Sequence, residues 1–147
     1  MSPPRILPPL DDRNRAFWTG GRHGQLLIER CPACGRWQHP PQGRCAGCGA
    51  DAVPTPASGR GTVFTYTVAE HQYHPEVPTP FVIAIVELAE QPDLRVVANV
   101  VGCDPADVRI GLPVRVAFEQ QGEHHVPVFE PVVEPTSVEP ASVAGEG

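Results

Sequence analysis

Four of the five cysteines fall into two close pairs with the spacing C-x2-C-x10-C-x2-C. The pairs are Cys31 with Cys34 and Cys45 with Cys48, and a glycine follows each second cysteine. Two intervening residues let a tight turn aim both sulfurs at one point, and the glycine permits a left-handed backbone that turns amides toward the thiolates. Four thiolates complete a tetrahedral zinc shell, so we expect one structural Zn2+ ion and no catalytic metal.

Two other interpretations of these cysteines stay open. A rubredoxin-like iron centre would use the same four ligands. Two redox-active dithiols would use the same pairs, but such motifs usually occur singly on a thioredoxin-like βαβ pattern, which the sequence lacks.

Four thiolates around Zn2+ leave a net negative charge, and Arg30, Arg36 and Arg44 lie beside the cysteines to offset it.

Further residues of metal-binding or catalytic type lie outside this motif. We predict that Cys103 is a partly buried small residue and that His39 lies beside the metal site or on the surface. The remaining candidates fall in predicted loops: His71, Tyr73, His74, His124 and His125. No carboxylate or nucleophile stands at a suitable local spacing, so we expect exposed loop side chains and assign no catalytic residue.

Short strands dominate the second half of the chain. Apolar residues that alternate or run continuously predict strands at 61–69, 81–88, 94–101, 112–118 and 126–129. Asp104 and Pro105 favour one helical turn between the third and fourth strands, with Gly111 as its stop. Five strands with this insertion favour a mainly β fold whose barrel is of the Greek-key OB type.

The first half of the chain is rich in proline, and its predicted helix and strand are short. Asp11 and Asp12 can cap a short helix that Gly20 and Gly21 stop, and a strand follows at 25–30. The chain therefore divides into a Pro-rich arm (1–10), the helix and a rubredoxin-like zinc ribbon (11–50), a linker (51–58), the OB-fold barrel (59–131) and a disordered tail (132–147).

Charge and motif content narrow the functional classes. The formal net charge is −6, and the predicted barrel contains only Arg60, Arg95, Arg109 and Arg115 as basic residues. A groove that follows a phosphate backbone needs more cations, which disfavours nucleic acid as the partner. The sequence has no membrane span, signal core, phosphate loop or nucleophile motif. We expect a cytoplasmic protein without catalytic activity of its own.

Several short motifs follow one another in a characteristic order. They are Phe17-Trp18, Gly24-x-Leu26 leading to Cys31, the four cysteines with Pro40-Pro41 between the pairs, Gly59 to Val63, Thr79-Pro80-Phe81, Val108 to Val114, and Pro127-x-Phe129-x-Pro131. Over roughly residues 11–131 the chain resembles the zinc-ribbon and OB-fold family catalogued as domain of unknown function 35.

The resemblance implies the role of a small partner subunit. Members of this family act with a thiolase-like (lipid-transfer-protein-like) enzyme or an acyl-CoA hydratase, and the zinc ligands carry over to Cys31, Cys34, Cys45 and Cys48. We therefore expect a non-catalytic, zinc-containing subunit in a hetero-oligomer with a thiolase-fold enzyme. The complex would take an acyl-CoA ligand, for example as an aldolase of steroid side-chain degradation.

A partner subunit should expose large apolar groups. Phe17, Trp18 and Trp37 are the candidates for partner contact, since aromatic side chains are enriched in interfaces. An alternative is that Phe17 and Trp18 seal the ribbon against the barrel. A free-standing acyl-CoA or lipid-binding protein, or a nucleic-acid-binding OB-fold protein, also remains open as a function.

Overall fold

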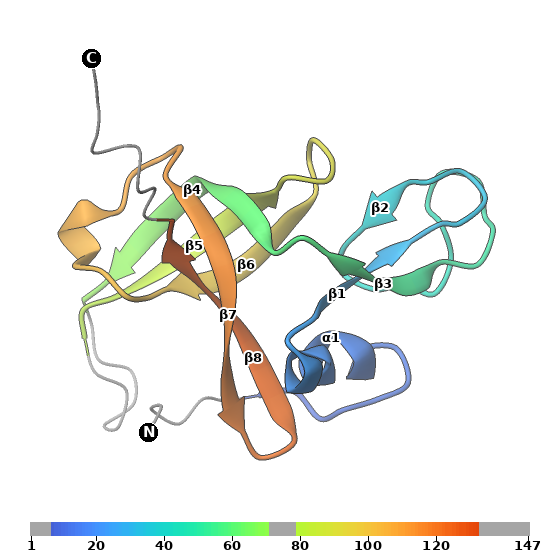
Figure 1. The fold of residues 1–147 in the computed structure, drawn as a ribbon, viewed down its shortest axis with the longest axis horizontal. Coiled ribbons are helices and arrows are strands. Elements are labelled where there is room, and N and C mark those ends of the chain that lie inside the picture. Colours follow the sequence, from blue (N-terminus) through green and yellow to red (C-terminus); the bar gives the residue numbers. More distant parts are fainter. Residues whose placement is uncertain (1–6, 71–78, 133–147) are drawn as a thin grey trace.

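The chain folds into a small N-terminal sheet followed by a five-stranded barrel (Figure 1). This computed structural model describes residues 7–70 and 79–132. The predicted loop residues His71, Tyr73 and His74, the start of the Pro-rich arm and the tail from residue 133 lie outside the described residues. None of the helices in the described ranges is long and apolar enough to cross a membrane.

The N-terminal α-helix begins later than we predicted and ends at the glycine pair. Asp11 Oδ1 accepts hydrogen bonds from the amides of residues 13 and 14 in a turn, and the helix α1 spans Arg15–Thr19 after this turn. Gly20 is the C-cap of α1, and the backbone continues from there as a 3-10 helix, η1 (Gly20–His23). A Cβ at Gly21 would lie 2.5 Å from the Phe118 ring, which shows that close packing requires this glycine.

The ribbon is a three-stranded antiparallel sheet of order β2-β1-β3. Its strands are β1 (Leu26–Arg30), β2 (Trp37–Gln38) and β3 (Val53–Ala57). The prediction of a linker at 51–58 was wrong, because β3 pairs with β1 along its whole length. Pro54 and Pro56 are tolerated there because β3 is an edge strand, whose outward positions need no amide donor.

The barrel closes in the order β4-β5-β6-β8-β7, with β6 parallel to β8 and the other pairs antiparallel. Its strands are β4 (Arg60–Ala69), β5 (Phe81–Leu88), β6 (Arg95–Val100), β7 (Pro113–Gln121) and β8 (His124–Pro131). The predicted helical turn is η2 (Pro105–Asp107), capped by the Asp104 carboxylate. These features confirm the predicted mainly β fold with an OB-type barrel.

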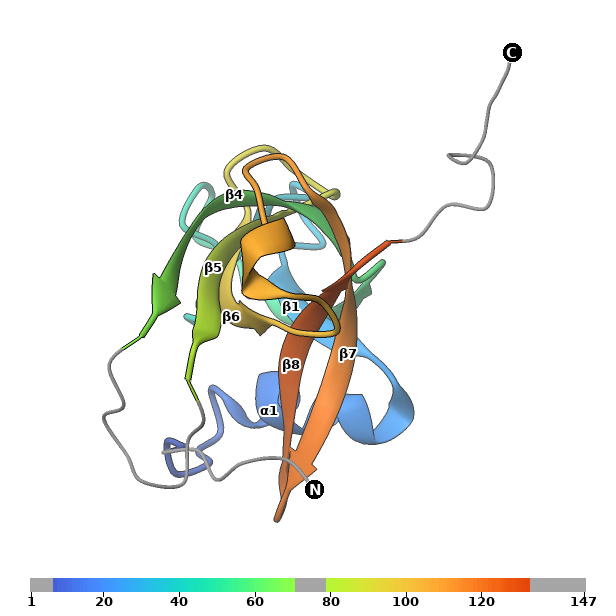
Figure 2. The ribbon, with the colours of Figure 1, turned by 90° about the vertical axis from the view of Figure 1, so that its left-hand side faces the viewer.

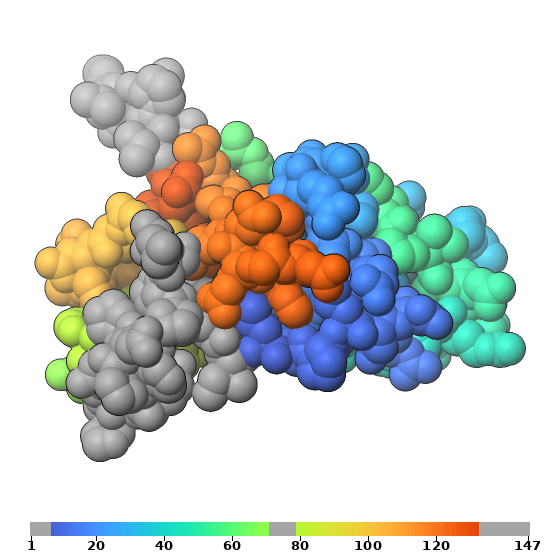
Figure 3. Space-filling model, turned by 90° about the horizontal axis from the view of Figure 1, so that it is seen from below, coloured from blue at the N-terminus to red at the C-terminus, as the bar shows by residue number. Residues whose placement is uncertain are grey.

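Alternation along the strands separates the barrel core from its surface. In β5, Val82, Ala84, Val86 and Leu88 are buried while the residues between them are half-buried or exposed. Strand β8 departs from this pattern with four consecutive buried residues, Val126 to Phe129. One face of β8 fills the barrel and the other packs against α1, which lies beside the β7–β8 hairpin (Figures 2 and 3).

Candidate metal centre

Two matching turns carry the four cysteines. Cys31 and Cys45 each begin a turn whose closing glycine, Gly35 or Gly49, donates its amide to the carbonyl of the first cysteine at 2.7 and 3.0 Å. Both glycines have φ near +80°, the left-handed conformation predicted for them. Cys31 and Cys45 are buried and Cys34 and Cys48 are exposed, so each turn contributes one inner and one outer sulfur.

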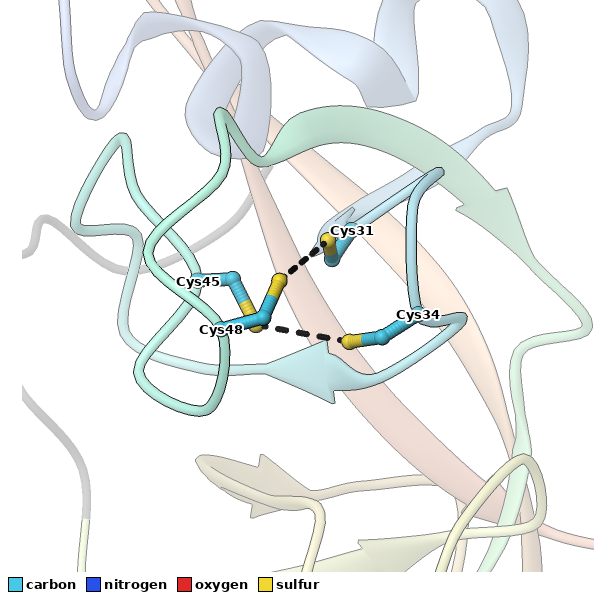
Figure 4. A group of neighbouring side chains, drawn as sticks. All are labelled: Cys31, Cys34, Cys45 and Cys48. Atoms are coloured by element: carbon cyan, nitrogen blue, oxygen red, sulfur yellow. Dashed lines mark hydrogen bonds between the residues drawn. The ribbon is translucent and has the colours of Figure 1, made fainter.

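The four sulfur atoms converge on one point (Figure 4). All lie within 4.8 Å of one another, with Cys31 Sγ 3.5 Å from Cys48 Sγ and Cys34 Sγ 3.6 Å from Cys45 Sγ. Zn–S bonds of about 2.3 Å in a tetrahedron place the sulfurs about 3.8 Å apart. The contacts at 3.5 and 3.6 Å join different Cys-x2-Cys pairs, an arrangement that fits one shared metal better than two separate dithiols.

Backbone amides favour the thiolate form of the first cysteine in each pair. The amides of Cys48 and Gly47 lower the pKa of Cys45 to about 6, and the Gly47 nitrogen lies 3.3 Å from Cys45 Sγ. The amide of Cys34 likewise lowers the pKa of Cys31. The Ala50 amide lowers the pKa of Cys48, but the neighbouring Cys31 thiol and burial outweigh it and raise that pKa to about 11. A thiolate is the form that binds a metal, so the turns favour the required charge state at Cys31 and Cys45.

A buried polar pair holds the ten-residue loop between the cysteine turns. Glu29 and Gln38 are both more than nine-tenths buried. The Glu29 carboxylate accepts hydrogen bonds from Gln38 Nε2 and from the amides of Gln42 and Gly43 at 2.7–2.9 Å. Gln38 also accepts from the Ala46 amide. Sequence analysis missed both residues, because their contacts span six or more positions and no local pattern marks them.

A side chain from the barrel fixes the ribbon in place. Gln91, in the turn between β5 and β6, accepts the Trp37 amide through Oε1 and donates Nε2 to the Trp37 carbonyl, each at 2.9 Å. The Gln91 side-chain amide therefore makes the pair of hydrogen bonds that a neighbouring strand would make to β2. The Arg30 guanidinium lies 5.3 Å from the centre of the Trp37 ring and donates to the Gly35 carbonyl, so it braces the first cysteine turn.

The predicted partner-contact residues differ in their surroundings. Phe17 is only 8% exposed and packs between Trp18 and His39, with ring centroids 5.0 and 4.7 Å away. This burial is what the sealing alternative expects, and a contact of Phe17 with a partner stays a prediction. Trp18 is half-buried and its ring meets His124 edge-on. Trp37 is also half-buried, and its contact with a partner stays a prediction.

The other candidates lie away from the sulfur cluster. His39 is half-buried against Phe17 and outside the four-cysteine group. Cys103 is half-buried near η2, as predicted. The prediction of exposed loop histidines was wrong for His124 and His125: both belong to β8 and are half-buried, because α1 and the backbone at Pro8 contact this strand.

Two family models match adjacent parts of the chain. The first, described as the ChsH2 rubredoxin-like zinc ribbon domain, matches residues 18–54, and the second, the ChsH2 C-terminal OB-fold domain, matches 54–119. The solved structure described as "Ltp2-ChsH2(DUF35) aldolase" superposes with a TM-score of 0.76 at 39% identity, over 86% of this chain and 100% of that chain. The chain belongs to the DUF35/ChsH2 family.

Curated members of the DUF35/ChsH2 family include subunits of acyl-CoA hydratases. The "probable enoyl-CoA hydratase alpha subunit" of Thermomonospora curvata is 41% identical over 137 residues, 90% of this chain. The "3-oxo-4,17-pregnadiene-20-carboxyl-CoA hydratase alpha subunit" of Mycobacterium tuberculosis is 37% identical over 138 residues, 89% of this chain. The chain spans 42% of the length of each of these relatives.

Proposed function

We propose that the chain is a zinc-containing accessory subunit of a thiolase-like, Ltp2-type aldolase that cleaves a steroid acyl-CoA. The observation that carries this proposal is the match to the ChsH2(DUF35) chain of an aldolase, which the present chain covers completely at 39% identity. In a retro-aldol cleavage, the hydroxyl group of a β-hydroxyacyl-CoA gives up its proton and the bond between the α and β carbons breaks. The β carbon becomes a ketone carbonyl, and the enolate left on the shortened acyl-CoA takes up a proton at its α carbon. The products are a ketone and a shortened acyl-CoA.

In this proposal the metal serves the fold of the subunit. Cys31, Cys34, Cys45 and Cys48 would hold Zn2+ with all four positions filled by protein, which leaves none for substrate or water. The ion would lock the two cysteine turns together and so fix the ribbon surface. Acyl-CoA would be a ligand of the complex, and the reacting groups would come from the partner enzyme.

A hydratase complex is the second candidate, favoured by the two curated relatives at 41% and 37% identity. The ribbon and barrel would then support addition of water to an α,β-unsaturated acyl-CoA. The two proposals share the accessory role and differ in the partner's reaction.

Co-expression with an Ltp2-type protein tests the proposal. The expected result is co-purification through a tag on either chain, together with release of a steroid ketone from a β-hydroxyacyl-CoA only when both chains are present. An assay with the unsaturated acyl-CoA in parallel detects the hydratase alternative. Full aldolase activity of the partner alone, with no co-purification, would contradict the proposed function.

A further inference from the structure

We propose that the outer face of β5 and β6, together with the groove beside Trp18, is the surface on which the thiolase-like partner docks. This inference rests on the proposed function and adds the location of the interface. Under this proposal Trp18, which borders the groove, belongs to the docking surface, and Trp37, which lies in the ribbon, does not.

Aliphatic side chains line up across this face. The strand register pairs Ile85 with Val97 and Ile83 with Asn99, so these residues point away from the barrel core on adjacent strands. Val97 is 67% exposed and Ile83 is 37% exposed, while Ile85 is half-buried. Contiguous exposed aliphatic residues cost free energy in water and are typical of interaction sites.

A hollow of about 230 Å³ extends the face toward the N-terminal helix. Trp18 and Phe17 form one side, Ile83 and Val97 the other, and Val126 and Pro127 of β8 also line it. Trp18 therefore presents part of its ring to the groove while the rest packs on His124. An aromatic wall beside aliphatic residues is the composition found at the centres of protein interfaces.

The charge on this face favours a protein partner over nucleic acid. OB folds bind oligonucleotides on this region of the barrel, where bases stack and cations follow the phosphates. Within β5 and β6 as the structure describes them, Arg95 is the basic residue, and its guanidinium lies 3.7 Å from the Phe64 ring centre and 3.0 Å from Asp93. The ion pair offsets its charge, so the face suits an uncharged apolar protein surface.

A different protein chain fits this surface better than a second copy of this chain or a small ligand does. Two copies of this chain would each bring a net charge of −6, which opposes self-association. The groove is smaller than the 300–1,000 Å³ typical of sites that enclose small ligands. The solved relative that this chain matches over its full length comes from a structure whose description names a second protein, Ltp2.

A matched pair of aspartate variants tests the location. Val97→Asp places a charge in the middle of the face, and Ile110→Asp places one at an equally exposed aliphatic residue, 68% against 67%, in the turn before β7. With purified Ltp2-type partner, Val97→Asp should weaken binding by about 30-fold or more, as loss of a central interface contact does. Ile110→Asp should bind like the wild type.

Fold integrity and the identity of the occupant are measured on the same proteins. Val97→Thr keeps the β-branched shape and should weaken binding by only a few-fold, and zinc content and melting temperature should match the wild type in all three variants. Unchanged partner affinity of a folded Val97→Asp variant would overturn the docking surface and leave the proposed function standing. Failure of the wild type to bind the partner would overturn both. A homodimer in light scattering that Val97→Asp dissociates, with partner affinity unchanged, would assign the face to a second copy.

Discussion

The ribbon and the barrel are stabilised by different interactions. In the ribbon, Leu26 and Ile28 of β1 pack in the apolar cluster that also contains the barrel core. The ribbon's other buried side chains include Cys31, Cys45, Glu29 and Gln38, so sulfur ligands and hydrogen bonds hold its loops. In the described part of the barrel, the buried side chains are apolar and come from all five strands. A sheet as small as the ribbon cannot bury enough apolar surface alone, whereas a closed barrel can. We therefore expect the ribbon to depend on a metal and the barrel on packing.

The largest expected effect comes from removing a zinc ligand. Cys31→Ser should abolish binding of one zinc per chain and unfold the ribbon, because metal binding supplies on the order of 10 kcal/mol to such modules. Elemental analysis and circular dichroism measure the two effects. Cys103→Ser is the control, since Cys103 lies outside the cluster. A folded Cys31→Ser ribbon without metal would contradict the claim.

The barrel should respond to loss of apolar volume instead. Phe129 is fully buried in β8, and Phe129→Ala should lower the free energy of unfolding by about 3–5 kcal/mol. Zinc content of the folded protein should stay the same. Phe64→Ala, at a residue 43% exposed on the same barrel, should cost far less in a denaturant titration. Equal costs for the two variants would show that packing does not hold the barrel.

Acid should weaken the contact between helix and ribbon. Burial lowers the pKa of His39 to about 4, while the nearby Glu29 charge partly opposes the shift. The unfolded chain protonates His39 near pH 6.5, so stability is full above that pH and falls between pH 6.5 and 4. Above pH 6.5, the neutral His39 should contribute about 3 kcal/mol to the free energy of unfolding.

The comparison with His39→Gln isolates this effect from protonation of the zinc ligands. Chemical unfolding at several pH values should show a steeper loss of stability in the wild type than in the variant. Parallel curves for the two proteins would rule out the histidine as the source.

The smallest expected effect concerns the joint between the two regions. Gln91→Ala removes both hydrogen bonds to the Trp37 backbone and should cost about 1–2 kcal/mol. Faster hydrogen exchange at the Trp37 amide is the specific readout, because barrel amides keep their partners. Gln120→Ala is the control, since that side chain donates to the Gly122 carbonyl within its own hairpin turn. An unchanged exchange rate at Trp37 would disprove the clamp.

Local patterns were sufficient for the parts that depend on neighbours in sequence. Alternation placed the barrel strands, and the cysteine spacing identified residues whose sulfurs meet in the structure. The prolines of β3 led us to predict a linker there. Proline is tolerated in β3 because this strand lies at the edge of its sheet, and the sequence does not show that β3 has this position. The glycine pair marked the end of the α-helix, but the sequence did not show that the Phe118 ring excludes a side chain at Gly21. Contacts such as Gln91 with Trp37 span 54 positions and leave no local signal.

Hydrogen exchange with and without a zinc chelator tests most directly whether the metal folds the ribbon and packing folds the barrel. After chelation, amides of β1, β2 and the cysteine turns should lose about 100-fold or more of their protection, whereas those of β5, β6 and β7 should keep theirs. Simultaneous loss of protection in both regions would contradict the claim by showing one cooperative unit. Full protection of a metal-free ribbon would contradict it as well.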